Sequence, residues 1–112
     1  MKEVLVFGGS GFLGEYLARE LIKKKYNVTI ADLKPGHPKC NFIKCDILSD
    51  NDLDLVFKNH YDYVFNLAGF ANLEDAIEQP IIAMKLNLIS NMSIIELCIK
   101  NDIKKYVYAS SS

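Results

Sequence analysis

A glycine-rich turn near the N-terminus constrains this chain more than any other feature. Gly8, Gly11 and Gly14 follow the apolar run 4–7 and lead into a helical pattern. A strand, a turn and a helix start in this order bring unpaired backbone N–H groups and the positive end of a helix dipole to one place. The turn therefore predicts a site for a dinucleotide pyrophosphate. The alternative is a tight strand-to-helix turn that binds no ligand.

Strand and helix patterns alternate along the rest of the chain. We expect strands at 3–7, 28–31, 41–45, 63–67 and 106–109, and helices at 11–24, 49–58 and 80–100. This alternation indicates parallel pairing of the strands through right-handed crossovers. The predicted fold class is therefore α/β, a Rossmann-like doubly wound parallel sheet.

Candidate binding residues follow these strands at their carboxyl ends, where ligands bind in doubly wound sheets. Asp32 lies 18 residues after Gly14 and is placed to accept hydrogen bonds from an adenosine ribose. Asp46 ends the third strand and is placed to reach an adenine amino group, although a turn is an equally ordinary role for aspartate. The runs 66–69 and 110–112 fall at the same edge.

Composition excludes several other classes of function. A chain of 112 residues holds one domain at most, and a net charge of -1 without a basic block argues against nucleic-acid binding. No apolar run is long enough for a membrane span. His37, Cys40 and Cys45 fit no zinc spacing, so we expect no metal site and treat the thiols as small apolar groups. Three cysteines and no signal-peptide pattern favour a cytoplasmic setting.

Taken together, these motifs resemble those of the extended short-chain dehydrogenase/reductase family, the NAD-dependent nucleotide-sugar epimerases and dehydratases. The resemblance spans all 112 residues and rests on the glycine turn, Asp32, Asp46-Ile47, the run 66–69, Pro80 with Asn87, and the run 106–112. It implies the strand order 3-2-1-4-5, NAD as the cofactor and a nucleotide sugar as the substrate. It also implies a homodimer through the helix at 80–100, whose apolar residues exceed one sheet-facing stripe.

The resemblance also implies roles for individual residues. Phe12 and Leu13 would present backbone N–H groups to the pyrophosphate, and Asn87 would steady the cofactor or the loop after the fourth strand. The run 67–71 would pass beside the nicotinamide, and Ser111 would be the active-site serine. The implied cofactor-binding residues are Gly8, Gly11, Phe12, Leu13, Gly14, Asp32, Asp46, Ile47, Leu67, Ala68, Gly69, Phe70, Ala71 and Asn87.

Some positions depart from the pattern of that family. Ser90 and Asn91 stand where a Gly-Thr pair is usual, and Asn66 stands where many members have His. No tyrosine in these 112 residues has lysine four positions later, so the acid/base pair Tyr-x-x-x-Lys is absent. We therefore expect an incomplete, N-terminal NAD-binding portion of an epimerase or dehydratase, inactive by itself. A non-catalytic dinucleotide-sensing domain and an NADP-dependent reductase of the same superfamily are the alternatives.

Overall fold

The computed structural model of the protein describes residues 1–68, 79–84 and 88–109. Five strands form one parallel sheet in the order β3-β2-β1-β4-β5, which confirms the expected fold class and strand order. The strands are β1 (Glu3–Phe7), β2 (Asn27–Asp32), β3 (Asn41–Lys44), β4 (Tyr63–Asn66) and β5 (Lys105–Tyr108). The helices are α1 (Phe12–Lys23), α2 (Asp50–Val56), α4 (Pro80–Met84) and α5 (Ser90–Lys100).

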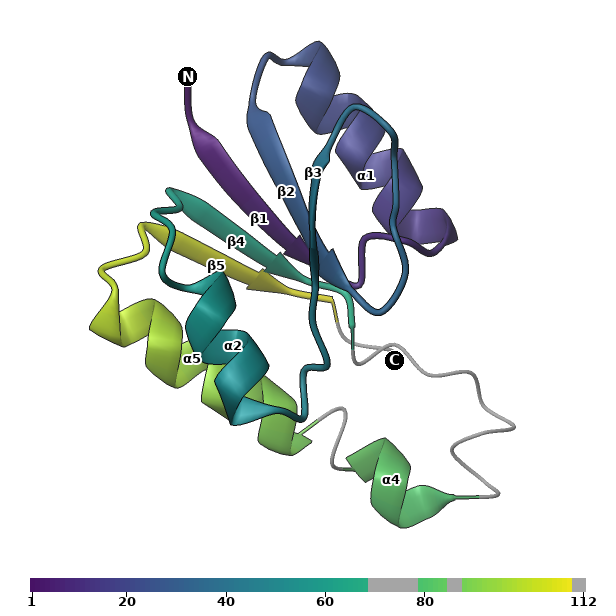
Figure 1. Ribbon diagram of the computed structural model, residues 1–112, viewed down its shortest axis with the longest axis vertical. Helices are drawn as coiled ribbons and strands as arrows, with labels where there is room; N and C mark the ends of the chain where they lie inside the picture. The colour runs from purple at the N-terminus through teal and green to yellow at the C-terminus, as the bar shows by residue number, and fades with distance from the viewer. Residues whose placement is uncertain (69–78, 85–87, 110–112) are drawn as a thin grey trace.

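Helices cover both faces of the sheet. Figure 1 shows α2 and α5 together on one side and α1 on the other. The central strand β1 is buried on both faces because successive side chains of a strand point in opposite directions. Leu5 and Phe7 pack with α2 and α5, whereas Val4 and Val6 pack with α1. This double burial explains the continuous apolar run that precedes the glycine turn.

The helix α1 forms because small and apolar residues recur on its inner side. Gly14, Ala18 and Leu21 are buried against the sheet at spacings of four and three residues. The helix ends at Lys23, and the chain reverses at Lys25, which adopts a left-handed conformation with φ 67°. This reversal returns the chain to the sheet as β2, directly beside β1.

One predicted helix is shorter in the structure than expected, and another lies partly outside the described residues. The helix α2, expected to run to residue 58, ends at Val56, and Ser49 caps its start by accepting a hydrogen bond from the backbone N–H of Asp52. The single helix expected at 80–100 is described as two, α4 and α5, with residues 85–87 outside the described part. The described parts begin at Pro80 and end at Lys100, as expected from the sequence.

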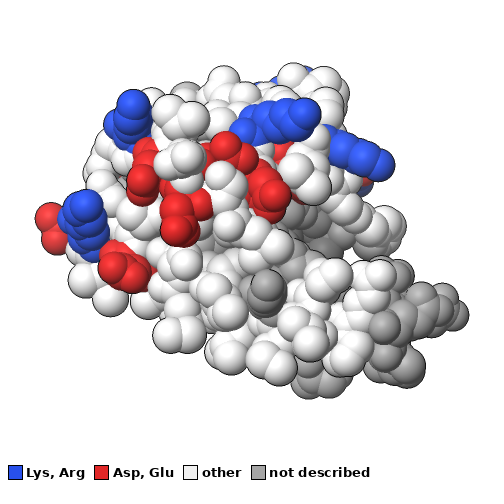
Figure 2. Space-filling view, turned by 60° about the horizontal axis from the view of Figure 1, so that its bottom comes forward, with Lys and Arg blue, Asp and Glu red and all other residues white. Residues whose placement is uncertain are grey.

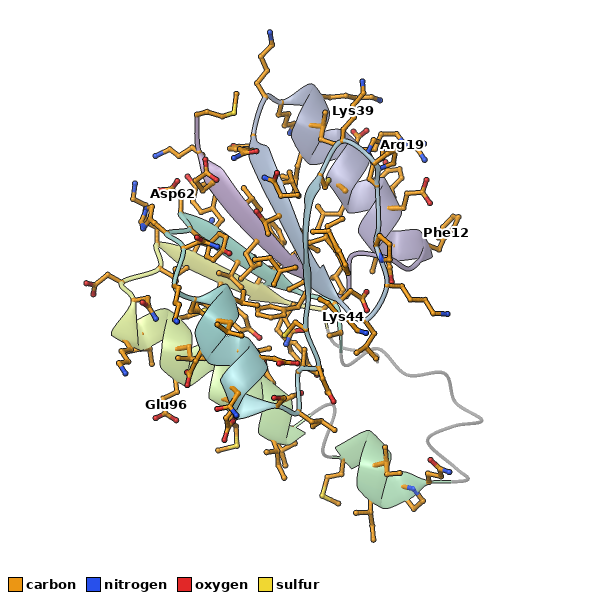
Figure 3. All side chains as sticks on the ribbon, viewed as in Figure 1. Phe12, Arg19, Lys39, Lys44, Asp62 and Glu96 are labelled. Carbon is orange, nitrogen blue, oxygen red and sulfur yellow. The ribbon has the colours of Figure 1, made fainter. Side chains whose placement is uncertain are left out.

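The amino-terminal edge of the sheet is held by the Asp62 carboxylate, which lies just before β4. It accepts a hydrogen bond of 2.8 Å from the backbone N–H of Glu3 and lies 3.6 Å from the Lys104 ammonium. The hydrogen bond from Glu3 is the main cause that lowers the pKa of Asp62. Figure 3 shows Asp62 at the opposite end of the sheet from Phe12, which begins α1. The polar cluster is therefore structural and remote from the glycine turn.

Candidate functional site

A hollow of about 600 Å³ opens at the carboxyl ends of the strands, beside the glycine turn. Its lining contains ten of the predicted cofactor-binding residues: Gly8, Gly11, Phe12, Leu13, Gly14, Asp32, Asp46, Ile47, Leu67 and Ala68. Ser10, Ala31, Leu33 and Cys45 also line it and were not predicted. The predicted residues Gly69, Phe70, Ala71, Asn87 and Ser111 lie outside the described residues. The structure thus gathers segments separated by up to 60 residues around one space.

Two glycines make close backbone packing possible at the turn. Gly8 adopts φ 76°, and a Cβ atom there would lie 2.7 Å from the backbone nitrogen of Ala68. A Cβ atom on Gly14 would lie 2.5 Å from the Cα atom of Gly9. By contrast, a Cβ atom on Gly11 would meet no heavy atom within 4 Å. Gly8 and Gly14 therefore bring backbone segments into contact, and Gly11 leaves the mouth of the turn open.

The N-terminus of α1 faces this hollow with its backbone. Gly11 is the N-cap residue and offers no side chain to cap the helix, and the intrahelical bonds begin with Glu15, whose N–H donates to the Gly11 carbonyl at 2.8 Å. The first turn of a helix leaves its N–H groups without intrahelical partners. The Phe12 side chain points away from the molecule and is almost fully exposed (Figure 3). The helix start thus offers N–H donors and a positive dipole end, which suit a phosphate group.

Asp32 ends β2 next to the glycine turn because β2 pairs with β1. Its Oδ2 atom accepts two hydrogen bonds from Ser10, one from the backbone N–H at 3.1 Å and one from the hydroxyl at 2.6 Å. Its Oδ1 atom accepts a hydrogen bond of 2.6 Å from the backbone N–H of Leu33. These three donors hold the carboxylate at the edge of the hollow.

The segment after β3 supplies a second part of the wall. Asp46 is exposed, and its Oδ1 atom accepts a hydrogen bond of 2.9 Å from the backbone N–H of Leu48, so the turn role considered for this residue is observed. Ile47 and Cys45 are buried on either side of it. Burial raises the pKa of the Cys45 thiol to about 12, so this sulfur is a neutral, apolar wall atom. Cys40 packs in the core on the opposite face, so it does not approach Cys45 as a metal site would require.

A partly buried hydrogen-bond chain supports the wall after β4. The Asn66 side chain is fully buried; its Oδ1 atom accepts a hydrogen bond of 3.0 Å from the backbone N–H of Ala68, and its Nδ2 atom donates at 3.0 Å to the Tyr106 hydroxyl. That hydroxyl donates in turn to the Asn91 side chain. Burial raises the pKa of Tyr106 to about 12, so the phenol stays protonated and remains a donor at neutral pH. The chain links β4, β5 and α5 to the Leu67–Ala68 part of the hollow.

Sequence reasoning missed Ser10, Tyr106 and Asn91 as parts of this arrangement. Ser10 lies inside the glycine turn, but its spacing carries no sign that its hydroxyl faces a residue 22 positions later. Tyr106 and Asn66 are separated by 40 residues. Asn91 appeared in the sequence only as a departure from a familiar pattern, and the structure shows that its side chain accepts a bond from Tyr106.

A parallel α/β sheet with a glycine turn, a helix N-terminus and an acidic residue at one hollow defines a dinucleotide-binding domain of the Rossmann type. Residues 4–112 match the NAD dependent epimerase/dehydratase family, and the chain belongs to that family. NAD, the predicted cofactor, is accordingly the cofactor of the family.

Individual relatives agree with this assignment. The chain is 33% identical to a UDP-N-acetyl-alpha-D-glucosaminuronate decarboxylase of Bacillus cytotoxicus, over 99% of this chain and 37% of the relative. An epimerase of Methanothermobacter thermautotrophicus has a TM-score of 0.90 at 33% identity, over 99% of this chain and 35% of that one. A UDP-glucose 4-epimerase of Thermus thermophilus, solved with NAD, has a TM-score of 0.87 at 25% identity. The match covers 97% of this chain and 37% of that one. The chain spans just over a third of the length of these relatives.

Proposed function

We propose that this chain is the NAD-binding, N-terminal portion of a nucleotide-sugar epimerase or dehydratase, in which hydride passes transiently between the sugar and bound NAD. The observation that carries the proposal is the hollow that joins the glycine turn, the start of α1 and Asp32. Membership of the NAD dependent epimerase/dehydratase family and the names of the relatives support the same reaction class.

The residues present fit a dinucleotide. The backbone at Phe12 and Leu13 would bind the pyrophosphate, since Gly11 leaves space for a phosphate where a side chain would otherwise project. Asp32 would accept hydrogen bonds from the adenosine ribose, and Asp46 with Ile47 would flank the adenine. The run 67–71 would lie beside the nicotinamide. Bound NAD supplies the hydride acceptor, and this chain binds and orients it.

The same site should prefer NAD to NADP. The Asp32 carboxylate would repel the additional 2′-phosphate of NADP, and no lysine or arginine occurs among the described residues that line the hollow. Titration of the full-length gene product with each dinucleotide tests this preference calorimetrically. Asp32→Ala should reduce the preference, whereas Asp54→Ala, which removes an exposed carboxylate of α2, should not. Equal or tighter binding of NADP by the unaltered protein would contradict the proposal.

Catalysis by the full enzyme would need residues outside these 112. We propose Ser111 as the residue that hydrogen-bonds the reacting oxygen of the sugar, and the acid/base pair Tyr-x-x-x-Lys is absent from this sequence. The purified 112-residue chain should therefore show no turnover with NAD and a panel of nucleotide sugars. Reproducible turnover above that of a Ser111→Ala control would show that a base exists elsewhere in the chain.

We also propose that α4 and α5 form a homodimer surface. Seven large apolar side chains between residues 80 and 100 are 48–74% exposed: Ile81, Ile82, Met84, Leu88, Ile89, Met92 and Ile99. Figure 2 shows a broad uncharged surface in the lower part of the molecule, below a band of acidic side chains. An apolar surface of this extent is typical of an association site.

Light scattering tests the dimer at micromolar concentration. Ile99→Lys should shift the full-length protein towards monomer, whereas Tyr16→Lys on α1, across the sheet, should leave the dimer intact. A monomeric unaltered protein would refute the proposal.

None of the described helices is long and apolar enough to cross a membrane. We propose a reducing, cytoplasmic setting, which the three unpaired cysteines support.

A further inference from the structure

The Ser10 hydroxyl makes a contact that the glycine pattern does not require. The pattern needs glycine at three positions and is indifferent to the residue at position 10. In the structure this hydroxyl lies 2.6 Å from the Oδ2 atom of Asp32, and Ser10 is one of the residues that line the hollow. The backbone N–H of Ser10 already donates to the same oxygen at 3.1 Å. The side chain therefore adds a second hydrogen bond between the glycine turn and Asp32.

The directions of these hydrogen bonds decide what the site can accept. An ionised carboxylate only accepts hydrogen bonds, with about four lone-pair positions on its two oxygens. Ser10 and the Leu33 N–H occupy three of them, which leaves about one acceptor position on the Oδ1 atom of Asp32. The Ser10 hydroxyl has a single proton, which it donates to Asp32, so its oxygen is left only as an acceptor. Both side chains therefore present acceptors to the hollow, with no hydrogen available for a phosphate oxygen.

We propose that Ser10 is a specificity-determining residue for the cofactor, acting together with Asp32. It restrains the carboxylate from rotating away from a 2′-phosphate, and its own oxygen accepts from ribose hydroxyl groups rather than donating to phosphate. This inference rests on the proposed dinucleotide site and assigns within it the residue that sharpens the choice of NAD over NADP.

The experiment compares dissociation constants of NAD and NADP, measured by calorimetry on the full-length gene product and its variants. Ser10→Ala should weaken NAD binding about three- to tenfold, the size expected for loss of one ordinary hydrogen bond, while NADP binding stays the same or tightens. The preference for NAD therefore falls. Ser10→Thr retains the hydroxyl and should retain the preference. Ser10→Cys replaces the hydroxyl with a thiol, which is a weaker hydrogen-bond donor, and should give an intermediate preference for NAD. This variant also provides a second measurement if the alanine variant folds poorly.

A matched control separates specificity from stability. Ser49→Ala deletes the hydroxyl that caps α2 and should lower the melting temperature without changing the ratio of the two dissociation constants. An unchanged ratio in Ser10→Ala, together with a reduced ratio in Asp32→Ala, would overturn the role of Ser10 and leave the proposed function intact. Failure of the unaltered protein to bind either dinucleotide would overturn the proposed function, and the role of Ser10 with it.

Discussion

Removal of one hydroxyl, by Tyr106→Phe, should break the hydrogen-bond chain behind the hollow while leaving the ring in place. The hydroxyl accepts from the Asn66 amide at 3.0 Å and donates to Asn91. After the substitution, one N–H of Asn66 has lost its partner at a position with no exposed surface. Asn91 is only partly buried, so water can replace its lost donor.

The expected cost follows from this difference in burial. A buried donor left without a partner costs about 1–3 kcal/mol, whereas the re-solvated Asn91 adds little. The apolar packing of the ring is unchanged, so no cavity contributes. A loss of this size is a large part of the roughly 5–15 kcal/mol that stabilises a typical domain.

Urea unfolding followed by circular dichroism measures the effect as a lower midpoint with an unchanged slope. Tyr16→Phe is the matched control, because Tyr16 is mostly exposed on α1, and it should stay within about 0.5 kcal/mol of the unaltered protein. The double variant Asn66→Ala/Tyr106→Phe should cost less than the sum of the single changes, because they share one bond. Equal midpoints for Tyr106→Phe and Tyr16→Phe, or strict additivity in the double variant, would refute the reasoning.

Gly14→Ala should lower stability by about 1–3 kcal/mol by overpacking, because its Cβ atom would lie 2.5 Å from the Gly9 Cα atom. Gly11→Ala, with no heavy atom within 4 Å of its Cβ, should lose less, because it changes only the N-cap preference, and equal melting of the two variants would contradict this contrast. Ser49→Ala should cost about 1 kcal/mol in urea unfolding by removing the α2 cap, and no loss would argue against that cap. Burial raises the pKa of Cys45 from 9.0 to about 12, so its contribution to stability is complete below about pH 9 and declines as the pH rises towards 12. Urea midpoints measured across this interval should fall less in Cys45→Ala, and an identical fall would exclude this thiol as a cause.

Local pattern was enough to predict the strands, their parallel pairing and the edge of the sheet at which Asp32 and the glycine turn lie. The apolar run 4–7, the glycine spacing and the alternation of strands and helices are short-range signals, and each reports the burial of one element. Because parallel strands end at the same edge, the pattern also placed Asp32 and the glycine turn together before any contact was known. The family resemblance then supplied the strand order that the structure confirms.

Tertiary structure alone decided which side chains meet. The bond between Ser10 and Asp32 spans 22 residues, and the bond between Asn66 and Tyr106 spans 40. Neither leaves a periodic signal, because such contacts depend on how neighbouring strands are registered and on which way a single side chain turns. In the stretch 80–100, by contrast, apolar residues occur almost all round, so periodicity indicated a helix without indicating which of its sides faces the sheet. Sequence determines the burial that each element needs, whereas contacts across elements exist only once the sheet has brought them together.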